Sequence, residues 1–344
     1  AYFKRYRACC FTSHGVLIVH CISAEKLSAR YAKELTVIVV SYNTASMTLK
    51  ALETLDLHNR STRFDCFVID NASTDGSVEQ ISAAFPMVRV ISLRKNVGFA
   101  RANNIAASYC TTPYFLLLNP DTEADAGAVN ALMTFAKTTP SAGIWGGRTV
   151  FSDRTLNKAS CWAAPSPRSL LYRAVGFSRI FAQSNMFNPE AYGGWKRDDV
   201  RQVDIVVGCF LLIRRDIWNG LGGFNEKYFM YGEDADLCLR ARTLGCHPII
   251  TPNAQIIHHV GASTKHNEEK AIMVMKARVS LIQDHWPTWQ VRYGIFLMWL
   301  WSALRFVITR PLAYSRNSKS VLRAQRWQMI WNNRRIWLNG YDQA

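Results

Sequence analysis

The chain of 344 residues lacks two glycine-rich nucleotide signatures. Neither G-x-G-x-x-G nor G-x-x-x-x-G-K-[ST] occurs anywhere in it. Their absence argues against a dinucleotide-binding fold and against a P-loop NTPase.

A disulfide framework is also missing. The nine cysteines are odd in number, no C-x-x-C occurs, and Cys9 and Cys10 are the only adjacent pair. Reduced thiols in a cytosolic protein are the simplest account of this pattern.

Acidic residues are scarce. The chain has 25 Asp and Glu against 41 Lys and Arg, a formal charge of +16. This balance suggests nucleic acid, an anionic membrane surface or phosphate-bearing substrates as partners. No acid occurs from His285 to Tyr341, where arginines alternate with tryptophans. That composition suits an anionic membrane interface, and equally a helical pair with a solvated basic face. Since no nucleic-acid module is recognisable, we expect no nucleic-acid partner.

Long apolar runs are missing from both ends of the chain. The run from Ala8 to Ile22 follows basic residues, like a signal peptide or weak anchor, but is short and polar for a span. We therefore expect an irregular or peripheral leader over residues 1–34. The uncharged run Tyr293–Leu304 is also short for a span and suits an interfacial or buried helix.

Between the two ends, apolar runs alternate with helical patterns. This alternation predicts an α/β fold with a mostly parallel sheet flanked by helices. Residues 152–200 lose the periodicity, and we expect a long loop there. The predicted strands cover residues 35–40, 64–69, 88–93, 114–118, 143–151, 202–213 with a break at Gly208, 249–250 and 255–257; the predicted helices cover 46–57, 78–85, 96–108, 126–137 and 233–244.

Polar side chains at the strand ends predict a nucleotide site. Tyr42 supplies a ring that can stack on a base, and Asp70 supplies an acceptor for a base imide N–H. The Asn96–Gly98 turn opens a helix where backbone N–H groups favour phosphate, and Arg101 adds a positive charge. Each residue alone is more simply a helix cap. Together, suitable side chains at successive strand ends favour nucleotide binding.

Two further strand ends suggest a divalent cation. Pro120 ends the buried strand of Leu116–Leu118, so that Asp121 leaves the carboxyl end of the sheet. Mg²⁺ and similar cations take one or two carboxylates together with substrate phosphates. An Asx turn is the simpler reading of such a tip. Beside an aspartate-bound cation, His258 at the end of another strand becomes a plausible ligand.

A further stretch rich in candidate functional residues runs from Gly222 to Asp236. Glu233 and Asp234 open a helix after a glycine-flanked aromatic loop. Acids in a first helical turn are favourable caps. Asp234 is also placed to act as a general base on an acceptor hydroxyl. Asp236 lies roughly 200° further around the helix, so we do not expect the two aspartates to share one site.

These motifs, taken in order, resemble glycosyltransferase family 2, the inverting enzymes of GT-A fold. The closest likeness is to the bacterial rhamnosyltransferase subgroup, and it extends from about Leu35 to Ser263. The residues that carry the resemblance are Val37–Asn43, Asp70–Ser77, Asn96–Ala100, Leu118–Asp121, Gly232–Asp234 and His258–His259.

The resemblance implies roles for individual residues. The donor site would comprise Tyr42, Asp70, Asn96, Gly98, Arg101, Asn119 and Asp121. Asp121 would be the last acid of the DxD metal motif, whose first acid is Asn119 here, as is often so in the rhamnosyltransferase-like subgroup. Asp121 and His258 would hold Mg²⁺ or Mn²⁺. Asp234 would be the catalytic base, with Glu233 and Gly208 on the acceptor side.

The resemblance also implies an organisation and a reaction. Residues 35–263 would form the catalytic domain, with a donor half (35–125) and an acceptor half (126–263). Residues 264–344 would form a basic, aromatic, membrane-associated helical extension. The enzyme would transfer a sugar, rhamnose from dTDP-rhamnose, from a dTDP- or UDP-linked donor to a lipid-linked or polysaccharide acceptor. It would act in the cytoplasm, at the inner face of the cell membrane.

Two alternatives stay open. A sugar nucleotidyltransferase also uses a nucleotide-binding α/β sheet, but its glycine-rich basic signature is missing from Ser41–Thr44. A non-catalytic membrane-associated assembly protein could use the same scaffold. Intact Asp70, Asp121 and Asp234 weigh against that second alternative.

Overall fold

The computed structural model describes residues 17–19, 33–58, 62–259 and 267–342. Most of the predicted leader therefore lies outside the described residues. Its described part, β1, pairs antiparallel with β4 at one edge of the sheet. The strands are β1 (Leu17–Val19), β2 (Leu35–Ser41), β3 (Phe64–Asp70), β4 (Arg89–Ser92), β5 (Tyr114–Leu118), β6 (Thr122–Ala124), β7 (Ile144–Val150), β8 (Leu156–Asn157), β9 (Cys161–Trp162), β10 (Arg201–Gln202), β11 (Ile205–Val206), β12 (Phe210–Arg214) and β13 (Ile249–His258).

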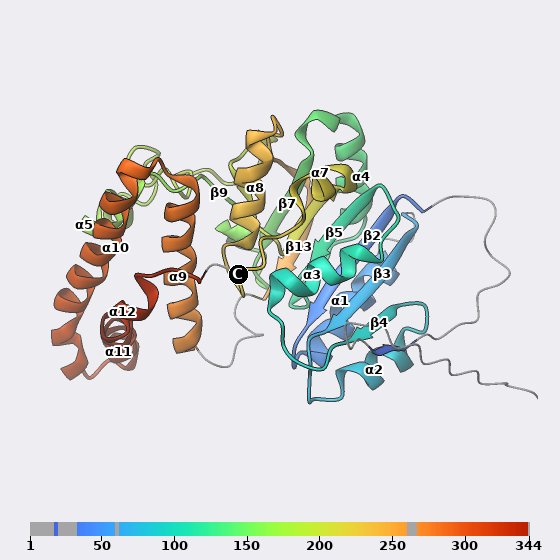
Figure 1. Ribbon diagram of the computed structural model, residues 1–344, viewed down its shortest axis with the longest axis horizontal. Helices are drawn as coiled ribbons and strands as arrows, with labels where there is room; N and C mark the ends of the chain where they lie inside the picture. The colour runs from blue at the N-terminus through green and yellow to red at the C-terminus, as the bar shows by residue number, and fades with distance from the viewer. Residues whose placement is uncertain (1–16, 20–32, 59–61, 260–266, 343–344) are drawn as a thin grey trace, which may run out of the picture.

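The helices fall into two groups, one around the sheet and one beyond it (Figure 1). They are α1 (Ala45–His58), α2 (Ser77–Ala84), α3 (Phe99–Ser108), α4 (Ala128–Thr138), α5 (Pro167–Val175), α6 (Phe177–Ile180), α7 (Arg215–Leu221), α8 (Glu233–Thr243), α9 (Asn267–His285), α10 (Thr288–Thr309), α11 (Ser318–Asn332) and α12 (Arg334–Trp337).

A mixed sheet forms the centre of the larger unit. Its strands lie in the order β1-β4-β3-β2-β5-β12-β7-β13-β10. The pairs β4–β3, β3–β2, β2–β5 and β7–β13 are parallel, whereas β12 is antiparallel to both of its neighbours. The predicted mostly parallel sheet flanked by helices is therefore confirmed, with β12 as an antiparallel strand in its middle.

Alternation along β2 explains how both faces of the sheet are covered. Ile38 and Val40 belong to a core that includes α3, α7 and α8, whereas Val37 and Val39 belong to a core that includes α1, α2 and α4. Every residue of β2 is buried. Since successive side chains point to opposite faces, the β-branched run fills both layers at once.

The order of the strands determines where a ligand can bind. The chain passes from β2 to β3 on one side, and later returns to β5 on the other side of β2. Ser41 pairs with Asp70, and Val39 pairs with Leu118, so the carboxyl ends of these three strands lie together. Open α/β sheets bind ligands at such a switch in strand order.

Two local predictions need correction. Residues 249–257 form one strand, β13, with an irregularity between Thr251 and Gln255, instead of two short strands. The stretch 152–200, expected as a loop, contains α5 and α6. The start of α5 has a capping box, in which Ser166 and Ser169 exchange hydrogen bonds, and Pro167 stands in the first turn. These local signals were present, but the lost apolar periodicity concealed them.

The C-terminal helices form a second core together with α5. Leu170 of α5 packs with Met275 and Val279 of α9, Met298 of α10 and Trp337 of α12. Helix α10 is longer than the predicted run. Among the described residues, Thr288–Tyr314 is the one stretch apolar and long enough to cross a membrane, with a mean hydropathy of 1.4 and only 22% of the apolar window buried.

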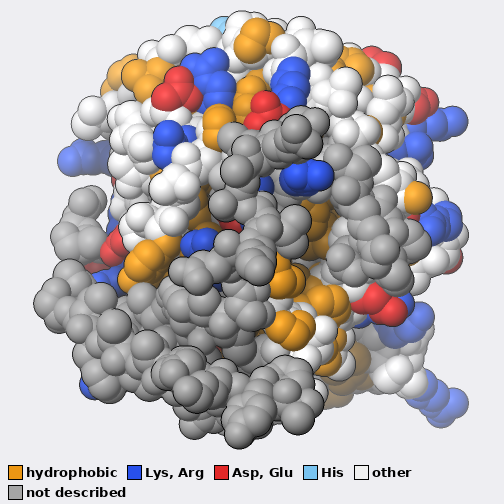
Figure 2. Space-filling view, turned by 90° about the vertical axis from the view of Figure 1, so that its right-hand side faces the viewer, with side chains coloured by type: hydrophobic (Ala, Val, Ile, Leu, Met, Phe, Trp, Pro, Cys, Tyr) orange, Lys and Arg blue, Asp and Glu red, His pale blue; other side chains and the backbone are white. Residues whose placement is uncertain are grey.

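Charge is distributed differently at the end of the molecule remote from these helices. On the visible part of that end, acidic side chains lie among the lysines and arginines (Figure 2). The acid-free stretch of residues 285–341 lies within the helical extension. The six described cysteines are buried and unpaired, consistent with reduced thiols.

Candidate active site

Asp70 lies at the carboxyl end of β3 with one free carboxylate oxygen. The side chain is 1% exposed. Its Oδ2 accepts hydrogen bonds from the Ser73 backbone N–H (3.1 Å) and the Ser92 hydroxyl (3.4 Å). Its Oδ1 is buried and has no hydrogen-bond partner among the described residues. Tyr42, 43% exposed, follows the strand residue that pairs with Asp70. A buried unsatisfied acceptor beside an exposed ring fits a base with an imide N–H.

Asn71 organises the turn before α3. Its Oδ1 accepts from the Val97 N–H (2.9 Å), and its Nδ2 donates to Oδ1 of Asn96 (2.9 Å). Asn96 in turn accepts from the Gly98 N–H (2.9 Å). Asn96 therefore shapes the turn, and its contact with a donor stays a prediction. Asn71 was not among the predicted site residues, although an amide at a strand end is a signal of this kind.

Gly98 allows the aromatic loop to approach the start of α3. Its φ is +84°, and a Cβ placed on it would lie 2.3 Å from the carbonyl oxygen of Phe229. That carbonyl also accepts from the Phe99 N–H (2.8 Å). This N–H is therefore engaged by the loop, and the glycine joins the donor half of the sheet to the loop before α8.

Helix α3 holds the same loop at a second point. Asn104 donates to the Phe224 carbonyl (2.9 Å) and accepts from the Phe224 N–H (2.9 Å). The exposed Arg101 lies 3.6 Å from Glu226. Arg101 therefore points to the loop, and its proposed contact with the donor stays a prediction. Asn104 was missed, because a polar residue in a helical pattern gives no sign of a distant partner.

The ends of β5 and β13 bring Asp121 and His258 together. The short strand β6 pairs Thr122 with His258, and the His259 N–H donates to the Asp121 carbonyl (2.9 Å). As a result Oδ1 of Asp121 lies 3.4 Å from Nε2 of His258, and both side chains are buried. Asn119 Oδ1 and His258 Nδ1 are also buried, without partners among the described residues.

These residues fit a divalent cation that the substrate helps to hold. No three His, Cys, Asp or Glu side chains converge on one point within the described part of the chain. The protein would therefore supply Asp121 and His258, with diphosphate and water completing the shell, as is usual for Mg²⁺. Burial disfavours a charged His258, but Cys209 and Asp121 outweigh it and raise the pKa of His258 to about 10. A bound cation would favour the neutral ring instead.

A hollow of about 290 Å³ lies beside Asp121. It extends between the start of α1 and the turn from β5 to β6, and it exposes both apolar and charged groups. Its lining comprises Ser46, Met47, Lys50, Pro120, Asp121, Thr122, Glu123 and His259.

Asp234 is held at the start of α8 by two backbone N–H groups. Gly208 donates to its Oδ2 (3.0 Å), and Ala235 donates to its Oδ1 (2.7 Å). Gly208 lies in the break between β11 and β12, as the sequence predicted. Burial raises the pKa of Asp234 above its ordinary value, although both N–H groups act in the opposite direction. A raised pKa increases the basicity of the carboxylate.

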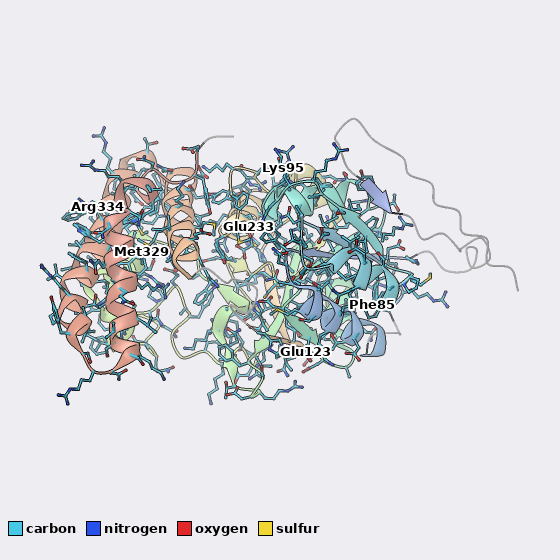
Figure 3. The ribbon with its side chains drawn as sticks, turned by 90° about the horizontal axis from the view of Figure 1, so that it is seen from below. Phe85, Lys95, Glu123, Glu233, Met329 and Arg334 are labelled. Atoms are coloured by element: carbon cyan, nitrogen blue, oxygen red, sulfur yellow. The ribbon has the colours of Figure 1, made fainter. Side chains whose placement is uncertain are left out.

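Glu233 lies beside Asp234 and is more deeply buried. Its Oε2 has no hydrogen-bond partner among the described residues. Burial, and then the charge of Asp234, raise the pKa of Glu233 well above the usual value. When two neighbouring acids are both buried, the negative charge of one raises the pKa of the other. The pair therefore favours a single negative charge. Figure 3 shows Glu233 at the junction between the sheet and the C-terminal helices.

Asp236 points away from Asp234, as predicted. It accepts from Arg240 Nε (2.8 Å) and lies 2.9 Å from His285 Nε2. Burial alone would raise the pKa of Asp236, but His285 and Arg240 lower it. Asp236 therefore joins α8 to α9.

The C-terminal extension also holds the loop before Asp234. Asp284 accepts from Lys227 Nζ (2.6 Å) and from the Tyr228 hydroxyl (2.8 Å). The Tyr341 hydroxyl donates to the Met230 carbonyl, and its ring packs on Tyr228. None of these tail residues was predicted near the site, because nothing in a local pattern places residue 341 beside residue 230.

The mixed sheet, covered by helices on both faces, has the architecture of the GT-A class of fold. The sequence profile described as Glycosyl transferase family 2 matches residues 36–219, more than half of the chain. The protein therefore belongs to glycosyltransferase family 2, and the resemblance found in the sequence is confirmed.

Relatives by sequence include enzymes of glycan synthesis. The N-acetylglucosaminyl-diphospho-decaprenol L-rhamnosyltransferase of Mycobacterium tuberculosis is 26% identical over 248 residues, 67% of this chain and 77% of the relative. The low-salt glycan biosynthesis hexosyltransferase Agl10 of Haloferax volcanii is 24% identical over 223 residues, 63% of this chain and 64% of the relative.

Similar solved structures include two glycosyltransferases. One is the mannosyltransferase PcManGT of Pyrobaculum calidifontis in complex with GDP-Man and Mn²⁺. The match has a TM-score of 0.53 at 16% identity, and it covers 90% of this chain and 84% of the mannosyltransferase chain. The other is GalNAc-T7 with UDP, GalNAc and Mn²⁺. That match has a TM-score of 0.54 at 12% identity, and it covers 86% of this chain and 54% of the GalNAc-T7 chain. At these identities the likeness is one of fold.

Proposed function

We propose that this glycosyltransferase transfers rhamnose from dTDP-rhamnose, with inversion, to a lipid-linked or polysaccharide acceptor in cell-surface glycan synthesis. The mycobacterial relative is named as a rhamnosyltransferase with a lipid-linked acceptor. The match to this chain covers 77% of that relative's length. The position of the enzyme would be cytoplasmic, at the inner face of the cell membrane.

The observation that carries the mechanism is the setting of Asp234. The Gly208 and Ala235 N–H groups fix both oxygens of its carboxylate, while burial raises its pKa. Asp234 takes the proton from an acceptor hydroxyl, and the hydroxyl oxygen forms its bond to the anomeric carbon. The bond from that carbon to the diphosphate breaks on the opposite face, so the configuration inverts without a covalent intermediate.

Glu233 supports this role through charge. Because the two acids share their protons, a protonated Glu233 leaves Asp234 as the ionised partner. A bound Mg²⁺ or Mn²⁺, held by Asp121 and His258, would supply neutralisation of the diphosphate leaving group. The free Oδ1 of Asp70 would accept the imide N–H that thymine and uracil share.

The test is a donor panel with a stereochemical readout. Purified protein is screened for thermal stabilisation by dTDP-rhamnose, UDP-linked and GDP-linked sugars, with and without Mn²⁺. The preferred donor is then turned over with a lipid-linked diphosphate acceptor, and the anomeric proton of the product is assigned by NMR. Stabilisation by dTDP-rhamnose and an inverted product are expected. Retention, or selective stabilisation by GDP-sugars, would refute the mechanism or the donor, respectively.

One added reaction completes the test of the two alternatives. Incubated with a sugar phosphate and a nucleoside triphosphate, a sugar nucleotidyltransferase would form a nucleotide sugar and release diphosphate. A non-catalytic assembly protein would give no product with any donor. Membership of family 2 and the settings of Asp70, Asp121 and Asp234 favour the transferase.

A further inference from the structure

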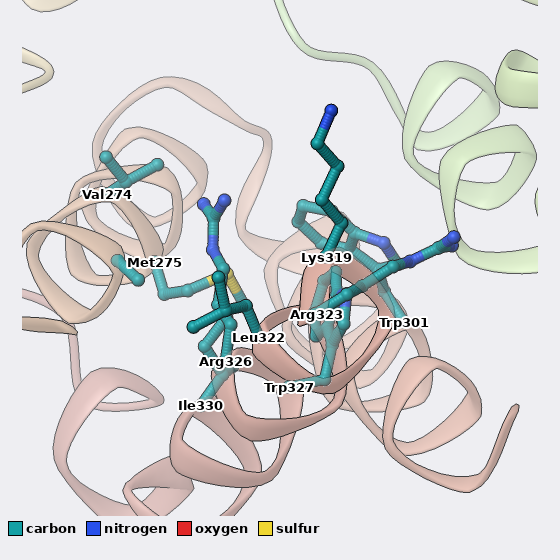
Figure 4. Close-up of a pocket in the computed structure, with 10 residues that line it drawn as sticks. Val274, Met275, Trp301, Lys319, Leu322, Arg323, Arg326, Trp327 and Ile330 are labelled. Carbon is teal, nitrogen blue, oxygen red and sulfur yellow. The ribbon is translucent and has the colours of Figure 1, made fainter. Parts of the chain in front are cut away.

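A second hollow, larger than the one beside Asp121, lies in the helical extension between α9 and α11. Its volume is about 480 Å³ (Figure 4). Trp301, Trp327, Met275 and Ile330 form its apolar part. The two tryptophan rings meet edge to face, with centroids 5.4 Å apart. We call this hollow the α9–α11 groove.

Three cations stand along the α9–α11 groove. Lys319, Arg323 and Arg326 follow one another at spacings of four and three residues, so they share one face of α11. In Figure 4 Lys319 and Arg326 extend in roughly the same direction, and Arg323 extends sideways, away from both. No Asp or Glu is among the described residues that line the groove. Among the described residues, none of the three cations forms a salt bridge. Their charge is therefore available to an anion.

More positive charge lies behind the tryptophans. The guanidinium groups of Arg173 and Arg278 lie 5.5 and 5.9 Å from the Trp301 ring, and both pair with the single carboxylate of Glu190. Arg305 donates to the Arg173 carbonyl. Burial, together with Arg179 and Arg323, lowers the pKa of Arg305. Repulsion between these cations means that an added anion would be favoured here.

The surface around the groove is apolar as well as basic. Leu322, at the groove, is 64% exposed, as is Val307 of α10. Tyr314 is 90% exposed, in the turn that leads to α11. Aromatic and aliphatic side chains next to cations suit the boundary between lipid headgroups and hydrocarbon. A soluble phosphate would gain nothing from these apolar neighbours.

We propose that the α9–α11 groove binds an anionic phospholipid of the bilayer, with its phosphate on the side that Lys319 and Arg326 share and with Arg323 adding positive charge at another part of the rim. Arginine guanidinium groups bind phosphate through paired hydrogen bonds. The glycerol and the first carbons of the acyl chains pack on Trp327 and Leu322. This site would orient the enzyme on the membrane, and it acts independently of which sugar is transferred.

The position of the groove separates it from the reacting centre. Helix α9 turns Ala271 and Met275 to the groove, and turns Lys270 and Ala277 to the loop before Asp234. A lipid in the groove therefore lies across α9 from Asp234. For this reason we assign the groove to a bilayer lipid and not to the acceptor.

The test uses the full chain and short-chain lipids below their critical micelle concentration, so that no charged surface contributes. Binding of dihexanoyl-phosphatidylglycerol is measured by calorimetry and by tryptophan fluorescence. Arg323→Gln/Arg326→Gln is expected to weaken binding by about tenfold or more. The matched control, Arg316→Gln/Arg335→Gln, removes two exposed arginines outside the groove lining and should bind as wild type. Thermal unfolding checks that both variants are folded.

Three probes decide between occupants. Dihexanoyl-phosphatidylcholine should bind far more weakly than the anionic lipid. Equal binding of inorganic phosphate would overturn the lipid assignment, since the chains would then contribute nothing. Tighter binding of farnesyl phosphate than of phosphatidylglycerol would assign the groove to an isoprenoid carrier instead. An equal loss in both double variants would leave only general charge attraction and would also overturn the proposal.

Discussion

The backbone N–H of Gly208 donates a 3.0 Å hydrogen bond to Oδ2 of Asp234, across 26 residues of sequence. The bond joins the break between β11 and β12 to the first turn of α8. It fixes one carboxylate oxygen and, with the Ala235 N–H on the other, limits how far burial can raise the pKa of Asp234. The carboxylate is thus both oriented and still able to ionise.

Asp234→Asn should remove the proposed base while it preserves the shape of the side chain and one of its two hydrogen bonds from the Gly208 and Ala235 N–H groups. An amide cannot accept a proton at neutral pH, so we expect kcat to fall by ~10²–10⁴-fold. The Kd for the donor should change little, because the predicted donor contacts lie at Asp70, the Gly98 turn and the cation. Steady-state kinetics and donor titration measure the two effects separately.

Asp236→Asn is the control for that substitution. Asp236 joins Arg240 to His285, so its loss should lower the free energy of unfolding, by about 1–3 kcal/mol. Catalysis in the folded fraction should persist. If Asp234→Asn kept most of its kcat while folded Asp236→Asn was inactive, the base would have to be reassigned to Asp236.

Gly98→Ala should disturb the contact between α3 and the aromatic loop. The new Cβ would lie 2.3 Å from the Phe229 carbonyl oxygen, at a φ of +84°. We expect a loss of about 3 kcal/mol or more in unfolding free energy, together with lower activity. Gly127→Ala is the matched control, because Gly127 also has a positive φ but has nothing within 4 Å of its Cβ position. It should cost only about 1 kcal/mol. Equal losses in chemical denaturation would contradict the steric argument.

The sheet and the strand-end residues were predictable because their signals are local. The β-branched run of β2 and the polar residues after it define both a strand and its end. The hydrogen bond that Asn71 accepts from Val97, the one that Asn104 donates to Phe224, and the approach of Tyr341 to Met230 depend on tertiary contacts that no short pattern contains. Helix α5 was missed for a related reason. Its apolar residues face a bundle formed 100 residues later, so its own short pattern was weak evidence.

Because of Glu190, the free energy of unfolding should depend on pH in the acid range. Burial alone would raise its pKa, but Arg278 and Arg173 lower it from 4.5 to about 2. The carboxylate is therefore charged more readily in the folded chain. Its stabilisation is fully present above pH 4.5 and is lost as the pH falls towards 2. The size is on the order of 3 kcal/mol.

Glu190→Gln tests this dependence by urea unfolding at several pH values. The variant should be less stable at pH 7, because two half-buried arginines lose their shared partner. It should also show a flatter decline of unfolding free energy between pH 4.5 and about 2. Glu53→Gln, which removes an exposed acid paired with Lys50, should keep the wild-type slope. An unchanged slope in Glu190→Gln would show that other acids control the decline.

Asp121 should be essential for a divalent cation. Its carboxylate is buried and faces His258 at 3.4 Å, so Asp121→Ala removes the carboxylate that would hold the cation with His258. Loss of charge neutralisation worth several kcal/mol should lower kcat by about 100-fold or more. His258→Ala should weaken Mn²⁺ binding, whereas His259→Ala should not, because His259 pairs with Glu123 instead. Titration with Mn²⁺, followed by electron paramagnetic resonance, measures the affinity for the cation. Activity assays in EDTA measure whether turnover depends on it. Full turnover by metal-free enzyme in EDTA would exclude the cation from the mechanism.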